Sequence, residues 1–111
     1  MPRIVLASAS VSRRRLLESA GLIPTIMVSH VDEETDFFNA MTPADMVIAL
    51  AITKAHTIRE QIDFPAIIIG CDSTFEFDSQ SLGKPATPEI AIERASRVRG
   101  NTGLLHTGHC I

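Results

Sequence analysis

Short apolar runs alternate along the 111-residue chain with longer segments whose apolar residues recur at helical spacing. Two runs rich in β-branched residues, at residues 4–6 and 66–71, predict buried strands, and residues 24–29 predict another. The run at 66–71 is continuously apolar, which is typical of a central strand covered on both faces. Extended character continues to a turn at residues 78–80, and residues 101–111 predict a last strand.

Three segments carry the signals of helices. The first, over residues 13–20, follows Ser10 or Ser12 as its N-cap and precedes a glycine. The second and third, over residues 43–61 and 88–100, each begin with a Thr-Pro pair, in which threonine caps and proline takes the first helical position. Strands that alternate with helices predict an α/β fold.

Composition predicts one globular domain over residues 1–111, with 45% hydrophobic and 21% charged residues. The formal net charge of -3 argues against non-specific binding of nucleic acid. No run approaches the roughly 18 apolar residues of a membrane span, so no membrane association is expected. Two cysteines, Cys71 and Cys110, form no CxxC pattern, and we interpret them as reduced thiols of a cytoplasmic protein.

One lysine interrupts the apolar face of the second predicted helix. Lys54 lies within a stripe formed by Val47, Leu50, Ala51, Ala55 and Ile58. A lysine at such a position must extend its ammonium group to water or meet an anion. We therefore expect that its removal leaves the fold intact or even stabilises it.

The segment at residues 8–15 is a candidate phosphate site. Small hydroxylic residues, including Ser8 and Ser10, lead from a strand into a helix N-terminus, where free N–H groups and the helix dipole favour anions. Three arginines follow in an unfavourable position relative to that dipole, which a bound anion would offset. The alternative is an ordinary capped helix with solvated arginines.

Two further positions are candidates for a catalytic or ligand-binding role. Asp72 ends the apolar run at 66–71, where a carboxylate can act as a general base or hold a metal ion, or simply form a turn. Lys84 is held between Gly83 and Pro85, which would aim its ammonium group, although the segment by itself favours an ordinary surface turn. The acidic segment at 32–36 must be solvated, paired or metal-bound.

The histidines and cysteines give weaker evidence of a functional site. His106 and His109 are three residues apart, and on a strand this spacing directs their rings to opposite faces, which argues against a zinc site. Cys71 is interpreted as a core residue rather than a nucleophile.

Five motifs in order resemble the Maf family, whose members are also known as septum-formation inhibitors. Its opening signature LASxSPRRxxLL is similar to residues 6–17, with Val11 in place of proline and Ser12 in place of the first arginine. The other matches are VDE at 31–33, A-x-x-K-A at 51–55, G-[AC]-D-[TS] and L-G-K-P at 70–73 and 82–85, and an echo of G-R-x-H-x-V-x-T-G at 100–108 in a shifted frame.

The resemblance implies an α/β fold with a mixed β-sheet flanked by helices, in a two-lobed Maf/ITPase-like architecture of which residues 1–111 are the N-terminal portion. It implies hydrolysis of nucleoside triphosphates to the monophosphate and pyrophosphate. The alternative is a non-catalytic nucleotide-binding regulator of septum formation or cell division. A homodimer is also considered.

The resemblance further implies a role for particular residues. Asp72 would be catalytic and, with Glu33, would hold Mg²⁺ or Mn²⁺. Ser12 and Ser73 would contribute to base selectivity. The residues expected to bind the substrate are Ser8, Ser10, Arg13, Lys54 and Lys84.

Overall fold

Two parallel strands form the centre of the fold in the computed structural model, which describes residues 2–83 and 85–111. Strand β1 (Arg3–Ala7) pairs in parallel with the first part of β3 (Ala66–Phe77), from Arg3 opposite Ala66 to Ala7 opposite Gly70. The short strand β2 (Thr25–Ile26) pairs in parallel with the other edge of β1. The carboxyl ends of β1 and of the parallel part of β3 therefore lie together.

The long strand β3 then changes partners. From Gly70 to Glu76 it pairs in antiparallel fashion with β5 (Leu104–Cys110), and near its end it pairs with β4 (Gln80–Leu82). The sheet order is β2-β1-β3-β4, with β5 also on β3. The predicted α/β fold with a mixed sheet flanked by helices is confirmed.

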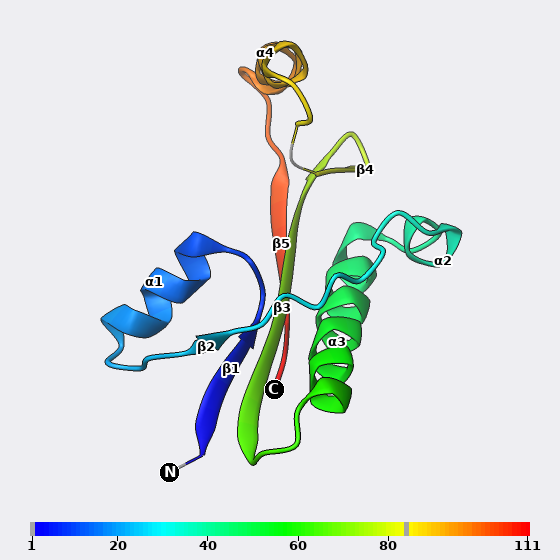
Figure 1. The fold of residues 1–111 in the computed structure, drawn as a ribbon. Helices are drawn as coiled ribbons and strands as arrows, with labels where there is room; N and C mark the ends of the chain where they lie inside the picture. The colour runs from blue at the N-terminus through cyan, green and yellow to red at the C-terminus, as the bar shows by residue number, and fades with distance from the viewer. Residues whose placement is uncertain (1, 84) are drawn as a thin grey trace.

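Helices α1 (Val11–Ser19) and α3 (Pro43–Gln61) lie on opposite sides of β1 and β3 (Figure 1). Helix α4 (Pro88–Val98) lies at the far end of β3 and β5, beyond β4. The sequence did not predict α2 (Asp36–Asn39), a single turn whose N-cap Thr35 accepts a hydrogen bond from the backbone N–H of Phe38. The two helices on opposite faces can thus supply side chains to both sides of β3.

Side-chain caps determine where the three longer helices begin. The side chain of Ser10 accepts a hydrogen bond from the N–H of Arg13, so Ser10, and not Ser12, is the N-cap of α1. Thr42 and Thr87 cap α3 and α4 in the same way, each followed by proline in the first turn. The predicted starts of α3 and α4 are confirmed because they depend on local hydrogen bonds, and α1 begins at Val11, two residues before the predicted segment.

The hairpin between β3 and β4 has a two-residue turn. Asp78 and Ser79 both have positive φ, 52° and 59°, and they connect the pair of Phe77 and Gln80. Two consecutive residues of this kind form the type I′ turn that matches the twist of a hairpin. The predicted turn therefore continues directly into β4, a strand that the sequence did not predict.

The predicted stripe of α3 packs against the sheet, and its five apolar residues are all buried, as predicted: Val47, Leu50, Ala51, Ala55 and Ile58. The helix comes so close at Gly70 that an added Cβ would overlap the backbone oxygen of Ala51. The expectation that residues 66–71 are covered on both faces was wrong in part, because Ile67 is 43% exposed. Contact at Gly70 sets the height of α3 above the carboxyl end of the parallel strands.

Among the residues that the structure describes, no helix combines the length and apolarity needed to cross a membrane.

Candidate active site

The candidate site lies at the edge of β3 that pairs first with β1 and later with β4. Between these two strands, this edge of β3 has no partner among the described residues. Ala7 and Gly70 form the last parallel pair, and the ladder with β4 begins only at Phe75. Buried Ser8 follows β1, and Asp72 lies just beyond the parallel part of β3. Ligands of open α/β sheets gather outside such carboxyl ends.

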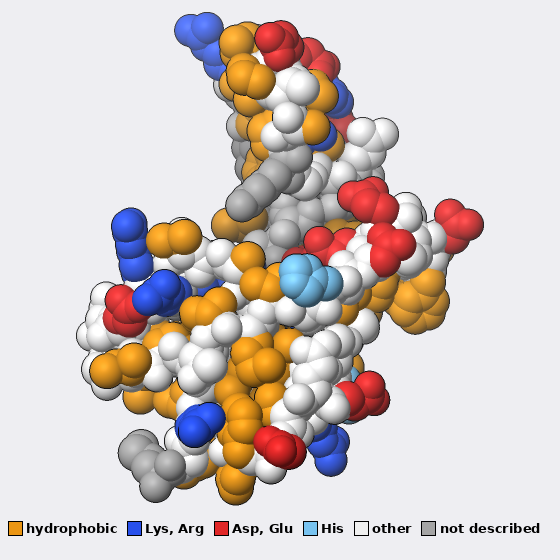
Figure 2. Space-filling model, in the orientation of Figure 1, with side chains coloured by type: hydrophobic (Ala, Val, Ile, Leu, Met, Phe, Trp, Pro, Cys, Tyr) orange, Lys and Arg blue, Asp and Glu red, His pale blue; other side chains and the backbone are white. Residues whose placement is uncertain are grey.

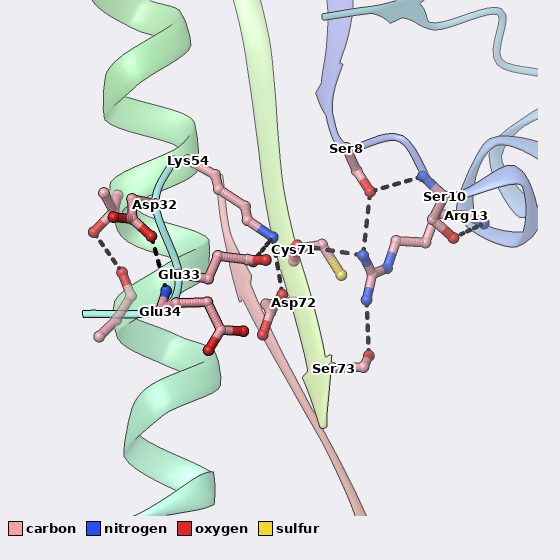
Figure 3. Close-up of polar contacts among 12 residues, drawn as sticks. Ser8, Ser10, Arg13, Asp32, Glu33, Glu34, Lys54, Cys71, Asp72 and Ser73 are labelled. Carbon is pink, nitrogen blue, oxygen red and sulfur yellow. Dashed lines mark hydrogen bonds and ion pairs between the residues drawn. The ribbon is translucent and has the colours of Figure 1, made fainter. Parts of the chain in front are cut away.

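The first cluster at this edge joins Lys54 to two carboxylates. Its Nζ lies 2.6 Å from Oε1 of Glu33 and 2.9 Å from Oδ1 of Asp72. The side chains of Lys54 and Asp72 are 15% and 14% exposed, whereas that of Glu33 is 44% exposed. Figure 3 shows Lys54 reaching from α3 to β3, with Glu33 in between. Residues from three separate segments therefore meet at one ammonium group.

Burial and charge alter the protonation of this cluster. Burial acts to lower the pKa of Lys54, but the hydrogen bonds and charges of Glu33 and Asp72 outweigh it, and the pKa is raised. The pKa of Asp72 is also raised, chiefly because burial disfavours its charged form, while Lys54 opposes this shift. The lysine thus remains charged, and Asp72 holds a proton more readily than an exposed aspartate does.

The second cluster fixes the guanidinium of Arg13. Its Nη1 donates to Oγ of Ser8 at 3.2 Å and to the carbonyl oxygen of Cys71 at 3.3 Å, and its Nη2 donates to Oγ of Ser73 at 2.8 Å. Ser8 Oγ also accepts the backbone N–H of Ser10 at 3.1 Å. The loop that leads from β1 into α1 is therefore tied to β3 through one arginine.

The two clusters extend from opposite faces of β3. Asp72 and Ser73 are consecutive residues of one strand, so their side chains point to opposite sides. Figure 3 shows Lys54 with Asp72 on one side of β3, and Arg13 with Ser73 on the other. Both clusters share the edge left open beyond Ala7, where an extended anion could contact them in succession.

Both Lys54 and Arg13 have partners within the protein, and contact with an anion is one of the two outcomes expected for Lys54. Lys54 meets two carboxylates, and Arg13 meets two hydroxyl groups and a carbonyl group. The partners come from elements that are distant in sequence, which is why the local pattern did not reveal them. Lys84, another predicted ligand, lies outside the described residues.

The remaining arginines of α1 differ from Arg13. Arg14 forms an ion pair of 2.8 Å with Glu18, one turn further along the helix, and Arg15 is exposed. Ser12, predicted to act in base selectivity, is exposed in the first turn. For Arg14 and Arg15, the alternative of a capped helix with solvated or paired arginines describes the structure.

Acidic side chains gather on the face shown in Figure 2, where the segment from β2 to α2 runs. Asp32, Glu33 and Glu34 are exposed there, and Glu33 forms the ion pair with Lys54. This acidic segment was expected to be solvated, paired or metal-bound, and pairing is observed for Glu33. Within residues 2–83 and 85–111, no group of three or more His, Cys, Asp or Glu residues is placed to hold a metal ion.

Two polar contacts near the site were not predicted. Thr107 Oγ1 lies 2.8 Å from Ser73 Oγ, and His106 Nε2 lies 3.0 Å from Glu76 Oε1. Both join β5 to β3, whose register only the folded sheet reveals. The alternation of side chains along a strand places Thr107 on the Arg13 face and His106 on the face of Asp72.

These features define an α/β protein with a charged site at the carboxyl ends of two parallel strands. The chain belongs to the Maf-like protein family, which matches residues 3–111. It is 47% identical over 110 residues, 98% of the chain, to a protein of Streptomyces coelicolor named nucleoside triphosphate pyrophosphatase. Proteins of the same name from Thermosynechococcus vestitus and Prochlorococcus marinus are 45% and 47% identical over 100% and 97% of the chain.

The chain spans about half the length of these curated relatives. The matched regions cover 52%, 55% and 57% of the three proteins.

Proposed function

We propose that this chain is part of a hydrolase that converts nucleoside triphosphates to the monophosphate and pyrophosphate. The observation that carries the proposal is the meeting of Lys54, Glu33 and Asp72 at the edge where Arg13 is also held. The names of the relatives in three bacteria support the same activity. A cytoplasmic location agrees with such a substrate, and a homodimer is part of the proposal.

Asp72 is the proposed general base. It would accept a proton from a water molecule while the water oxygen attacks the α-phosphorus, and the bond from that phosphorus to the bridging oxygen would break. Pyrophosphate then leaves with the electron pair of that bond. A raised pKa suits this role, because a base works best when its pKa is nearer to the working pH.

The cations are the proposed ligands of the phosphates. Arg13 has five N–H donors, of which three are engaged in the structure, so others remain for phosphate oxygens. Lys54 is proposed as a second phosphate ligand at the same edge, where Glu33 and Asp72 compensate its charge in the structure, and Lys84 is proposed as a third cation. Such catalysis consists mainly of positioning and charge stabilisation. Ser8 and Ser10 are proposed contacts, and Ser12 and Ser73 are proposed to affect base selectivity.

The residues fit a divalent metal ion. Asp72 and Glu33 direct hard oxygen donors to one point, now at Nζ of Lys54, and Glu33 is accessible to solvent. Mg²⁺ is commonly bound by one or two carboxylates together with substrate phosphates, so a larger protein cage is not required. When bound, Mg²⁺ or Mn²⁺ would neutralise phosphate charge. Glu33 and Asp72 would hold it.

The proposal is tested by measuring pyrophosphate release from a panel of nucleoside triphosphates with Mg²⁺ or Mn²⁺. The same assay on the Streptomyces coelicolor relative serves as the reference. EDTA should abolish release, and added Mg²⁺ should restore it. Activity that persists in the chelator contradicts the metal assignment, and nucleotide binding without hydrolysis by either protein favours a regulatory nucleotide-binding role.

A further inference from the structure

A threonine on β5 extends the hydrogen-bond network around Arg13. Ser73 and Thr107 are directly opposite in the ladder between β3 and β5, and their hydroxyl oxygens lie 2.8 Å apart. Ser73 Oγ also accepts the N–H of Arg13 Nη2 at 2.8 Å. One serine hydroxyl therefore connects α1 to β5 across the edge of the sheet.

The hydroxyl of Ser73 needs a second partner to keep a fixed direction. A serine side chain at an exposed position can rotate among three staggered conformations, and its hydroxyl hydrogen rotates as well. Threonine is restricted at χ1 because it is β-branched, and on a strand its backbone is fixed by the ladder. Thr107 thus offers Ser73 a more rigid partner than water would.

The partners of Arg13 also differ in charge from those of Lys54. Within the described part of the chain, the guanidinium donates to two hydroxyl oxygens and one carbonyl oxygen, all uncharged. Lys54 instead lies between two carboxylates. Arg13 is therefore oriented without neutralisation of its charge, which is the arrangement of a preorganised donor for an anion.

We propose that Thr107 is a positioning residue that orients the Ser73 hydroxyl and, through it, the guanidinium of Arg13 toward the substrate phosphates. This role rests on the proposed function. Thr107 itself touches no reacting atom. It acts by keeping Ser73 in the direction that Arg13 requires, so that less rotational freedom is lost when the phosphate binds.

The test uses Thr107→Val, which has nearly the same shape but no hydroxyl, and Thr107→Ser, which restores the hydroxyl. Thr107→Ala removes the hydroxyl without adding a methyl group, and it replaces the valine variant if that variant does not fold. Thr25→Val on β2 is the matched control, because it makes the same exchange at an exposed strand position.

The first readout does not depend on any activity. The rotation of the Arg13 guanidinium about its Nε–Cζ bond is measured by nitrogen NMR in the chain without nucleotide. Rotation should be faster in Thr107→Val and Thr107→Ala than in the wild type, and Thr107→Ser and Thr25→Val should match the wild type. Equal rotation rates in all variants would overturn the proposal.

The second readout is the Kd of a non-hydrolysable nucleoside triphosphate with Mg²⁺. Loss of one uncharged hydrogen bond should weaken binding about 2- to 12-fold in Thr107→Val, with recovery in Thr107→Ser. If the wild type binds but Thr107→Val binds equally well, the role of Thr107 is refuted and the proposed function stands. If the wild type does not bind, the proposed function fails in this chain, and the NMR measurement still decides whether Thr107 orients Arg13.

Discussion

Nζ of Lys54 lies 2.9 Å from Oδ1 of Asp72, although 18 positions separate the two residues in the chain. The contact joins the buried side of α3 to the strand that runs past the end of β1. It depends on the close approach of α3 to Gly70, where no side chain keeps helix and strand apart. A lysine on an apolar helical stripe and an aspartate at a strand position thereby become parts of one site.

Asp72→Asn should lower turnover by about 10²–10⁴-fold, because asparagine cannot accept the proton of the attacking water. Its amide oxygen can still accept a hydrogen bond from Lys54, so the variant should remain folded. Turnover and thermal melting are measured together. Asp78→Asn in the hairpin turn is the control, since asparagine tolerates the positive φ of 52° there. A folded Asp72→Asn variant with normal turnover would remove the catalytic assignment.

Lys54→Ala should destabilise the protein, by about 1–3 kcal/mol, because it leaves the half-buried Asp72 without the cation that compensates it. The expectation from the sequence was an intact or stabilised fold, since the local pattern indicated no carboxylate that depends on this lysine. Urea denaturation measures the change. Arg15→Ala, at an exposed position of α1, should change stability much less. An unchanged or higher urea midpoint for Lys54→Ala would mean that its ion pairs contribute no net stability.

The acid limb of the pH profile of kcat/KM should reflect Asp72. A general base must be deprotonated, so activity should fall as the pH decreases through the pKa of this carboxyl group. Burial raises that pKa above the ordinary value of 3.8, which places the limb at a higher pH than for an exposed aspartate. Steady-state rates measured between pH 4 and pH 8, about the range in which carboxyl groups of raised pKa titrate, would define this acid limb. A limb at or below 3.8 contradicts this assignment.

Gly70→Ala should both destabilise the protein and impair the site. The added methyl group would overlap the Ala51 carbonyl oxygen and crowd Ala55, which pushes α3 away from the sheet. Overpacking of this kind typically costs about 1–3 kcal/mol. Gly83→Ala is the control, because an added Cβ there meets no atom within 4 Å. Chemical denaturation should separate the two variants, and equal stability would show that the helix moves without cost.

The sequence by itself determined the elements that depend on neighbouring residues. The caps at Thr42 and Thr87 satisfy backbone N–H groups three residues away, and both helices begin where this chemistry predicts, whereas the sequence left Ser10 and Ser12 as alternatives for α1. The buried stripe of α3 follows equally from a period of 3.6 residues, because the apolar side must face the sheet. The order of motifs was also sufficient to indicate the family.

Only the tertiary structure decided which side chains meet. The packing of α1 and α3 on opposite sides of β3 determines that Asp72 faces Lys54 while Ser73 faces Arg13, and the register of β5 brings Thr107 to Ser73. None of these contacts has a local signature, because each joins residues at least 18 positions apart. Strand pairing and helix packing set such distances, and both are properties of the folded chain as a whole rather than of any short segment.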